Sequence, residues 1–329
     1  MTKSTWLPTN SKAGEYKRKD SEFRHWITKN GLQSGFKAEP GRYHLYVSLA
    51  CPWAHRTLIF RQLKNLEDII SVSVVHPDMP DNDWTFQNDS QSAECYGTTG
   101  DTLYASERLS QRYTESADNY SAIVSVPVLW DKQKKCIVNN ESSEIIRMFN
   151  SAFNHITGNS LDFYPEHLRS DIDQINTLVY HKINNGVYKT GFASTQKAYE
   201  DNCKKLFSGL DKIESLLSKQ RFLAGNNISE ADWRLFPTLI RFDAVYHTHF
   251  KCNIRLIKEY THIYNYMLEL YQYENIAETI NMAHIKRHYY ASHLSINPYG
   301  IVALGHQQNW AKAHNRNTIN YSQGKRNES

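Results

Sequence analysis

The stretch "YVSLACPWAHRTLIF", residues 46–60, places a single cysteine between two segments of different character. The residues before it, "YHLYVS" at 43–48, are rich in β-forming side chains, and those after it carry Leu58 and Ile59 at helical spacing. We therefore predict a strand that ends just before Cys51 and a helix that begins just after it. Pro52 suits the first helical position, because a backbone N–H there would go unpaired.

A cysteine at such a junction is a candidate nucleophile. The positive end of the helix dipole and the unpaired backbone N–H groups favour the thiolate, and so lower the pKa of a thiol in this position. A second cysteine three residues later would resolve a mixed disulfide, but this position holds Ala54. If Cys51 reacts, an external thiol must release the adduct, and glutathione is the abundant intracellular candidate. A buried structural cysteine is the alternative that this local context leaves open.

The segments that follow predict a parallel strand pair and a hairpin. A β-branched run, "IISVSVV" at 69–75, comes after the helix and completes a β-α-β unit. Further on, "VPVLWD" (126–131) and "KCIVNN" (135–140) predict a hairpin, and "ESSEIIRMFN" (141–150) begins a helix. The order β-α-β followed by β-β-α is a thioredoxin-like arrangement.

We expect this thioredoxin-like domain to span residues 41–155, after an irregular N-terminal extension over 1–40. A polar insertion near 76–125 interrupts it. Because a loop of that length without secondary structure is unusual in a compact domain, we expect a helix inside the insertion, over 103–114.

Helical spacing dominates beyond residue 160, which predicts an all-helical domain over 160–312. Its strongest local signal is "ISEADWRLF", in which Ser229 is the expected N-cap and Asp232 reaches back as the acid of a capping box. The residues 313–329 are polar and are expected to form a disordered tail.

Composition excludes several classes of protein. The chain has 329 residues, and its 38 basic and 34 acidic side chains are scattered, so we expect no nucleic acid and no membrane among its partners. No apolar stretch approaches the roughly 18 residues of a membrane span, and the first residues lack a secretory signal. The five cysteines are odd in number and widely spaced, which favours a reducing, cytoplasmic location.

Histidines raise the question of a metal. His284 and His288 stand one helical turn apart, and the segment 247–249 adds two more histidines. No glutamate follows His284 as in the helical zinc-protease motif, so we expect packing or pocket roles and no metal.

Several segments, in order, resemble the glutathionyl-hydroquinone reductases, the xi class of the glutathione transferases. The resemblance spans about residues 20–305 and rests on "CPWAHRTLIF", "VPVLWD", "NNESSEIIRMFN", "NNGVYKTGFASTQ", "RFDAVY", "HFKCN" and "HIKRHYYASHLSINPYGIV". It implies the glutathione transferase fold, an α/β thioredoxin-like N-terminal domain plus an all-α C-terminal domain. The resemblance makes the first the glutathione-binding domain and the second the substrate domain. It also implies glutathione as co-substrate and a homodimer.

The resemblance implies a reaction as well. Cys51 attacks the sulfur of a glutathionyl-hydroquinone, the hydroquinone leaves, and a second glutathione releases oxidised glutathione from the mixed disulfide. Two alternatives stay open: an omega-like thiol transferase that acts on dehydroascorbate or mixed disulfides, and a non-catalytic glutathione-fold binding module. The first shares the Cys-Pro-x-Ala motif, and the retained Cys51 disfavours the second.

Five residues are expected to bind glutathione. The Val126–Pro127 bond is the candidate cis peptide, whose exposed backbone would pair with the cysteinyl part as an added strand. Glu141 and Ser142 start a helix, where they can hold the γ-glutamyl ammonium and carboxylate. Trp84 matches a family residue that covers glutathione. The alternatives are a trans edge-strand proline, an N-cap serine beside a surface charge, and a tryptophan that anchors the insertion.

Tyrosines are expected at the substrate pocket. The leaving carbon needs a proton as its bond to sulfur breaks, and a phenol can supply it. Tyr188 and Tyr289 match family tyrosines, and Tyr290 is a further candidate for the pocket wall. Because the chain has 21 tyrosines, packing is the alternative for each.

One departure from the family is visible before "VPV". Relatives often carry a basic residue there, where this chain has Ile123. Arg108 and Arg112 are candidates to compensate for a lost glutathione contact, and lower affinity is the alternative.

Overall fold

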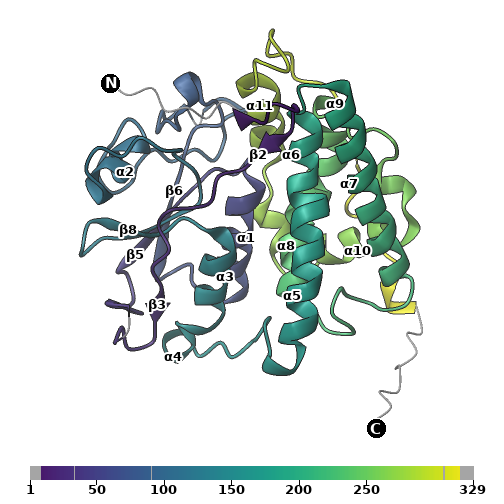
Figure 1. Ribbon diagram of the computed structural model, residues 1–329. Helices are drawn as coiled ribbons and strands as arrows, with labels where there is room; N and C mark the ends of the chain where they lie inside the picture. Colours follow the sequence, from purple (N-terminus) through teal and green to yellow (C-terminus); the bar gives the residue numbers. More distant parts are fainter. Residues whose placement is uncertain (1–8, 33, 90, 307, 319–329) are drawn as a thin grey trace. The chain divides into compact units, whose positions relative to one another are not determined.

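The computed structural model describes residues 9–32, 34–89, 91–306 and 308–318. It divides into two compact units, which are Met1–Asp162 with Glu278–Gly305 and Phe163–Ala277 with His306–Ser329. Figure 1 traces both along the chain.

The first unit is built on a sheet with the strand order β6-β5-β7-β8. Its strands are β5 (Tyr43–Val47), β6 (Ile70–Val74), β7 (Val128–Asp131) and β8 (Cys136–Asn139). β5 is parallel to β6 and antiparallel to β7, which is in turn antiparallel to β8. The predicted β-α-β unit and hairpin are thus confirmed. Every residue of β5 is buried, as expected of a strand with a neighbour on each side.

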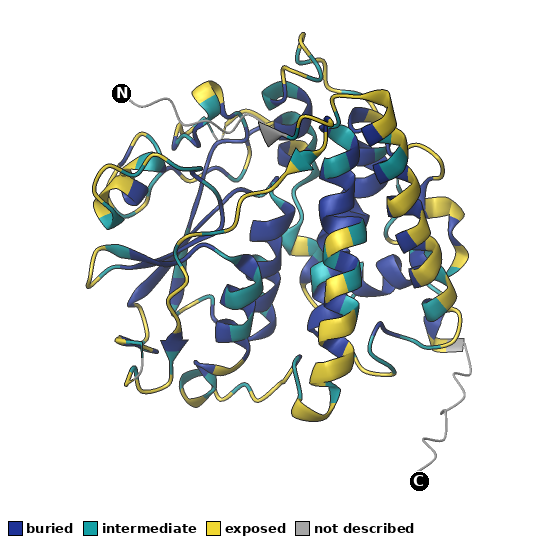
Figure 2. Ribbon diagram, in the orientation of Figure 1, coloured by how far each residue is buried: buried dark blue, intermediate teal, exposed yellow. Residues whose placement is uncertain are grey.

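Two helices of this unit, α1 (Pro52–Leu63) and α3 (Ser142–Ser151), pack against one another. Most of α1 is buried, which Figure 2 shows as a dark blue helix. Its polar residues are therefore hydrogen-bonded inside the protein, as His55 is to the hydroxyl of Thr279 at 2.8 Å. The remaining helices of the unit are η1 (Pro80–Asn82), α2 (Ser110–Ser116), α4 (Asn154–Thr157) and α11 (Met282–Ser292).

The helix predicted over 103–114 is wrong at its start, because α2 begins only at Ser110. The preceding residues turn around Asp101, whose carboxylate accepts hydrogen bonds from the N–H groups of Leu103 at 3.0 Å and Ser106 at 3.2 Å. A side chain that takes up backbone N–H groups in this way competes with helix formation.

The N-terminal extension contains short paired segments. β1 (Thr9–Asn10) pairs antiparallel with β2 (Tyr16–Lys17), and β3 (Ile27–Thr28) pairs in parallel with β4 (Phe36–Lys37). The extension is therefore tied to itself at two places by backbone pairing.

The described part of the second unit is mainly helical. Its elements are η2 (Glu166–Leu168), α5 (Arg169–Leu178), η3 (Val179–Asn184), α6 (Asn185–Gly191), α7 (Gln196–Leu217), α8 (Glu230–Arg241), η4 (Phe242–Tyr246), α9 (His247–His249), η5 (Ile257–Glu259), α10 (Thr261–Tyr271) and η7 (Arg316–Thr318), and η6 (Ile276–Thr279) lies where the units divide. The predicted capping box is confirmed, since the Asp232 carboxylate accepts the Ser229 N–H at 2.7 Å. None of the described helices is long and apolar enough to span a membrane.

One helix groups differently from the predicted helical domain over 160–312. α11 belongs to the first unit, where Arg287 donates to the carboxylate of Asp78 at 2.8 Å and also pairs with Glu94. The ring of His288 lies 2.8 Å from the Pro77 carbonyl oxygen. These partners come from the insertion, so no pattern within α11 itself could reveal the grouping.

The segment expected to be a polar tail, 313–329, lies outside the described residues from 319 onward. Its first part is docked on the second unit. Arg316 is buried and donates hydrogen bonds to the carbonyl oxygens of Leu217 at 3.0 Å and Gln220 at 2.8 Å. Residues 316–318 therefore belong to the folded unit.

Candidate active site

The sheet topology gathers three segments at one edge. β5 runs towards Cys51, and the antiparallel strand β7 begins beside the end of β5, because Tyr46 pairs with Val128. β8 is antiparallel to β7 and so ends at the same edge, just before Glu141. The strand order thus brings five predicted residues to this edge, in the loops or at the start of a helix: Cys51, Val126, Pro127, Glu141 and Ser142.

Cys51 is the N-cap of α1, with extended backbone angles (φ −75°, ψ 123°) and Pro52 as the first helical residue. Its side chain makes no capping hydrogen bond, and the residue is half-buried. The thiol lies 3.5 Å from the Val126 carbonyl oxygen. The Val126–Pro127 peptide bond is cis, as predicted.

The other four thiols are in different surroundings. All five cysteines are free. Burial is the main cause that raises the pKa of the Cys95, Cys136 and Cys203 thiols, and it raises that of Cys252 furthest. These four thiols are therefore protonated near neutral pH and poor nucleophiles.

The backbone of Val126 is not used by the sheet, since β7 begins two residues later. Its carbonyl oxygen faces the Cys51 thiol, and no described residue accepts a hydrogen bond from its N–H. A backbone segment with an unpaired N–H beside a sheet can pair with an extended peptide.

Glu141 is the N-cap of α3, so neither of the following serines takes that role. Its Oε1 accepts hydrogen bonds from the N–H of Ser143 at 3.0 Å and from the Ser143 hydroxyl at 2.8 Å. Burial raises the pKa of Glu141, but these hydrogen bonds, with the charges of Arg18 and Arg56, outweigh burial and leave the pKa below its ordinary value. The carboxylate is therefore charged at neutral pH.

Ser142 is the first residue of α3 and is buried. No described residue accepts a hydrogen bond from its N–H. Its hydroxyl oxygen accepts one from the Arg56 guanidinium at 3.4 Å, and that guanidinium also lies 4.6 Å from the ring centre of Trp53. Arg56 is a further candidate for the site, and the sequence did not reveal it because its contact with α3 leaves no local pattern.

Trp84 lies in the insertion and is almost fully buried. Its ring stacks on His288 of α11, with ring centres 4.8 Å apart, and its carbonyl oxygen accepts the N–H of Leu109 at 2.9 Å. These are the contacts of an anchor, the alternative that the sequence left open.

The three predicted tyrosines are buried. Tyr289 and Tyr290 lie on α11 in the first unit, and the ring of Tyr289 meets those of His288 and His293 edge to face. Tyr188 lies on α6 in the second unit, in an aromatic cluster with Phe192, Tyr246 and Phe250. Each tyrosine therefore has a packing role, whatever else it does.

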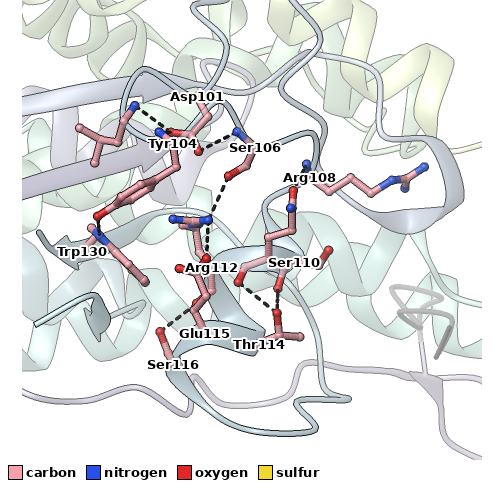
Figure 3. A network of polar contacts seen from close by, with 12 residues as sticks. Asp101, Tyr104, Ser106, Arg108, Ser110, Arg112, Thr114, Glu115, Ser116 and Trp130 are labelled. Atoms are coloured by element: carbon pink, nitrogen blue, oxygen red, sulfur yellow. Dashed lines mark hydrogen bonds and ion pairs between the residues drawn. The ribbon is translucent and has the colours of Figure 1, made fainter.

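The arginines considered as substitutes for a basic residue at Ile123 are engaged elsewhere, and Figure 3 shows the contacts of Arg112. Arg112 is buried, donates to Ser106 at 3.0 Å and to Glu115 at 2.7 Å, and lies over the ring of Tyr104. Arg108 pairs with the exposed carboxylate of Asp81 at 3.2 Å. Both guanidinium groups thus have partners within the insertion.

One group of possible metal ligands occurs among the described residues, and it contains none of the histidines considered from the sequence. The ligand atoms of His76, Asp89 and Cys95 lie within 4.8 Å of one another. However, Nδ1 of His76 accepts the N–H of Asp78 at 3.0 Å, so the ring proton is on Nε2. Nε2 lies 3.0 Å from a carboxylate oxygen of Asp89 and 3.3 Å from the sulfur of Cys95.

Comparisons with known proteins agree on one family. Models of the glutathione S-transferase N-terminal and C-terminal domains match residues 50–152 and 196–269. The chain is 50% identical over 317 residues to the glutathionyl-hydroquinone reductase YqjG of Escherichia coli, covering 95% of each chain. It is 48% identical over 306 residues to the glutathionyl-hydroquinone reductase PcpF of Sphingobium chlorophenolicum, covering 93% of this chain and 94% of the other.

Solved structures give the same result. The glutathione-bound structure of YqjG matches with a TM-score of 0.87, covering 90% of this chain and 96% of the other. The glutathione-S-transferase Xi of Phanerochaete chrysosporium matches with a TM-score of 0.85 at 50% identity, covering 90% of this chain and 94% of the other.

Proposed function

The chain belongs to the glutathionyl-hydroquinone reductases, the xi class of the glutathione transferases, and on that basis we propose that it reduces glutathionyl-hydroquinones with Cys51 as nucleophile. Glutathione is the co-substrate. The observation that carries the proposal is the position of Cys51 at the uncapped start of α1, with no second cysteine at residue 54.

The reaction has two steps. The Cys51 thiolate attacks the glutathione sulfur of the aryl thioether, and the carbon–sulfur bond breaks with its electron pair going to the ring carbon, which takes up a proton. The products are the hydroquinone and a mixed disulfide between Cys51 and glutathione. A second glutathione thiolate then attacks the glutathione sulfur of this disulfide, which yields oxidised glutathione and restores the Cys51 thiolate.

Glutathione is held at the edge of the sheet in this proposal. The Glu141 carboxylate takes the γ-glutamyl ammonium, and the N–H and hydroxyl of Ser142 take the neighbouring carboxylate. The backbone of Val126, before Pro127, pairs with the cysteinyl part, which suits its unpaired N–H. Trp84 covers the bound peptide from the insertion.

The hydroquinone is bound by tyrosines in this proposal. Tyr188 and Tyr289 are the candidate acids for the leaving carbon, and Tyr290 contributes to the pocket wall. The helical unit, which contains Tyr188, then acts as the substrate domain, and the sheet unit as the glutathione-binding domain.

A parallel assay tests the proposal against the omega-like alternative. The purified chain is given glutathione with either a glutathionyl-hydroquinone or dehydroascorbate. We expect rapid release of free hydroquinone and little reduction of dehydroascorbate. Preference for dehydroascorbate would establish the thiol transferase, and inactivity towards both substrates would establish the binding module.

A homodimer is part of the proposal, because one segment of the first unit exposes many apolar side chains. The exposed residues are Leu294 (55%), Tyr299 (89%), Ile301 (69%), Val302 (36%) and Leu304 (95%). Asn297 holds this segment in place with hydrogen bonds to the carbonyl oxygens of Tyr290 at 2.7 Å and Ile301 at 2.9 Å. An ordered apolar patch of this kind suits a second copy of the chain.

Light scattering after size exclusion tests the dimer. We expect a dimer for the unaltered chain and a monomer for the Ile301→Ser, Leu304→Ser double variant. A monomer in both cases would contradict the assignment.

A cytoplasmic location completes the proposal, since none of the five cysteines forms a disulfide and a reducing compartment keeps thiols in that state.

A further inference from the structure

A pair of arginines flanks the ring that follows the candidate nucleophile. Trp53 is nearly buried at the start of α1. The guanidinium carbon of Arg18, from the N-terminal extension, lies 4.2 Å from its ring centre, and that of Arg56 lies 4.6 Å from the same centre. Two guanidinium groups thus lie near the same indole ring, beside the candidate active site.

The two arginines differ in their exposure and in the hydrogen-bond partners of their guanidinium groups. Arg56 is buried and donates to the Ser142 hydroxyl. Arg18 is exposed, and no oxygen in the described part of the chain accepts a hydrogen bond from its guanidinium. Its N–H donors are therefore available to a ligand, and a guanidinium is suited to a carboxylate, which it can bind with two parallel hydrogen bonds.

Hydrogen bonds hold the N-terminal extension beside the start of α3. They place the segment that contains Arg18 near Glu141. Ser21, three residues after Arg18, donates to the Glu141 carboxylate and to the Asn140 carbonyl oxygen, each at 3.3 Å. Phe23 and Asn140 add two hydrogen bonds, of 3.2 and 3.1 Å. The charge of Arg18 is felt at Glu141, where it contributes to the lowered pKa of that carboxyl.

A zwitterion bound at this place needs a partner for each of its two charges. The carboxylate of Glu141 is charged and suits the γ-glutamyl ammonium. The adjacent carboxylate of the ligand then needs donors of its own. Ser142 offers this carboxylate hydrogen bonds without charge, and Arg18 offers charge as well.

We propose that Arg18 of the N-terminal extension binds the α-carboxylate of the γ-glutamyl residue of glutathione. The inference rests on the proposed placement of glutathione at Glu141 and Ser142. It gives the extension a direct part in the site.

Titration calorimetry on the full chain tests this with two ligands, glutathione and γ-aminobutyryl-cysteinylglycine, which lacks only the α-carboxylate. We expect Arg18→Gln to weaken binding of glutathione about tenfold, the usual effect of losing a charge-assisted hydrogen bond, and to leave binding of the analogue within about twofold. Arg18→Lys, which keeps the charge, should fall between. Lys19→Gln is the control, because it removes an exposed cation one residue away and should change neither affinity.

An equal loss for both ligands in Arg18→Gln, or no loss for either, would overturn the inference. Equal affinity of the unaltered chain for the two ligands would overturn it too. The measurement needs no turnover, so a failure to reduce glutathionyl-hydroquinones would refute the proposed reaction and leave this result standing.

Discussion

The starts of α1 and α3 lie at the same edge of one sheet and are finished in opposite ways. The N-cap of α1 is Cys51, whose side chain makes no capping hydrogen bond. The N-cap of α3 is Glu141, whose carboxylate accepts both the N–H and the hydroxyl of Ser143. We call the start of α1 open, because the side chain of its N-cap residue does not cap it, and the start of α3 closed, because its own acid does.

The difference separates two tasks that a glutathione enzyme needs. The Cys51 side chain is not used for capping, so it can carry the negative charge that the positive end of the helix dipole stabilises, and the start of α1 suits chemistry. A capped start holds its acid in one fixed, charged position, so the start of α3 suits recognition of a zwitterion. Arg56 links the two, since it is on α1 and donates to Ser142 of α3.

The largest effect is expected from Cys51→Ala. We expect hydroquinone formation to fall to the detection limit, a loss of at least about a thousandfold, because the mixed disulfide cannot form. Cys136→Ala is the matched control, a second half-buried thiol in the same unit, and should retain full activity. Steady turnover by Cys51→Ala would show that the open helix start is not the reacting one.

Tyrosine substitutions extend the comparison, because they test whether a group outside the two helix starts takes part in the reaction. Tyr188→Phe and Tyr289→Phe remove the candidate acids while keeping the rings. One of the two tyrosines is expected to protonate the leaving carbon. In the variant that lacks this tyrosine hydroxyl, we expect release of hydroquinone to slow about a hundredfold, with little change in glutathione affinity. Single-turnover kinetics measures this, and Tyr246→Phe is the packing control for the Tyr188 cluster. Unchanged kinetics in both variants would remove the assigned acid role.

A smaller effect is expected at the closed start. Glu141→Gln keeps the shape of the cap but removes its charge. We expect the KM for glutathione to rise about tenfold with kcat nearly unchanged, as for a lost binding contact. Glu144→Gln is the control, because it removes a carboxylate from the same helix that pairs with Arg24. A fall in kcat alone in Glu141→Gln would place the residue in chemistry and break the division of tasks.

The smallest effect concerns β5, the strand that positions the start of α1. His44 is buried between the hydroxyls of Ser71 at 2.7 Å and Ser73 at 2.9 Å, and burial lowers its pKa to about 3. Below about pH 6.5 the imidazole of His44 takes up a proton in the unfolded chain but not in the folded chain. The contribution of His44 to stability is therefore present above pH 6.5 and is lost as the pH falls towards 3.

Denaturant unfolding at pH 7 and pH 5 measures this effect. We expect His44→Gln to lose less unfolding free energy between these pH values than the unaltered chain does, by about 2 kcal/mol. An equal loss in both proteins would show that the imidazole is not kept neutral in the folded state.

Local patterns in the sequence account for most of the framework. The β-α-β unit around Cys51, the hairpin and the capping box at Ser229 all depend on residues close together in the chain, and local patterns predict all three. The cis bond before Pro127 was expected from the thioredoxin-like fold and not from a local pattern. The start of α2 was not predicted, because the Asp101 side chain takes N–H groups that a helix would use.

The contacts that complete the candidate site could not be predicted, because their partners are far apart in the sequence. Ser21 and Glu141 are separated by 120 residues, and Arg56 and Ser142 by 86. The stacking of Trp84 on His288 likewise joins the insertion to the last helix of the unit. Periodicity and capping rules describe neighbours along the chain and contain nothing about such pairs.

The central claim is that one thiol, at the open start of α1, carries glutathione during the reaction. The direct measurement is mass spectrometry of the full chain after one equivalent of glutathionyl-hydroquinone in the absence of free glutathione, followed by peptide mapping. We expect one glutathione per chain, on the peptide that contains Cys51, and its complete removal when glutathione is added. Release of hydroquinone without any adduct, or with the adduct on another cysteine, would contradict the claim.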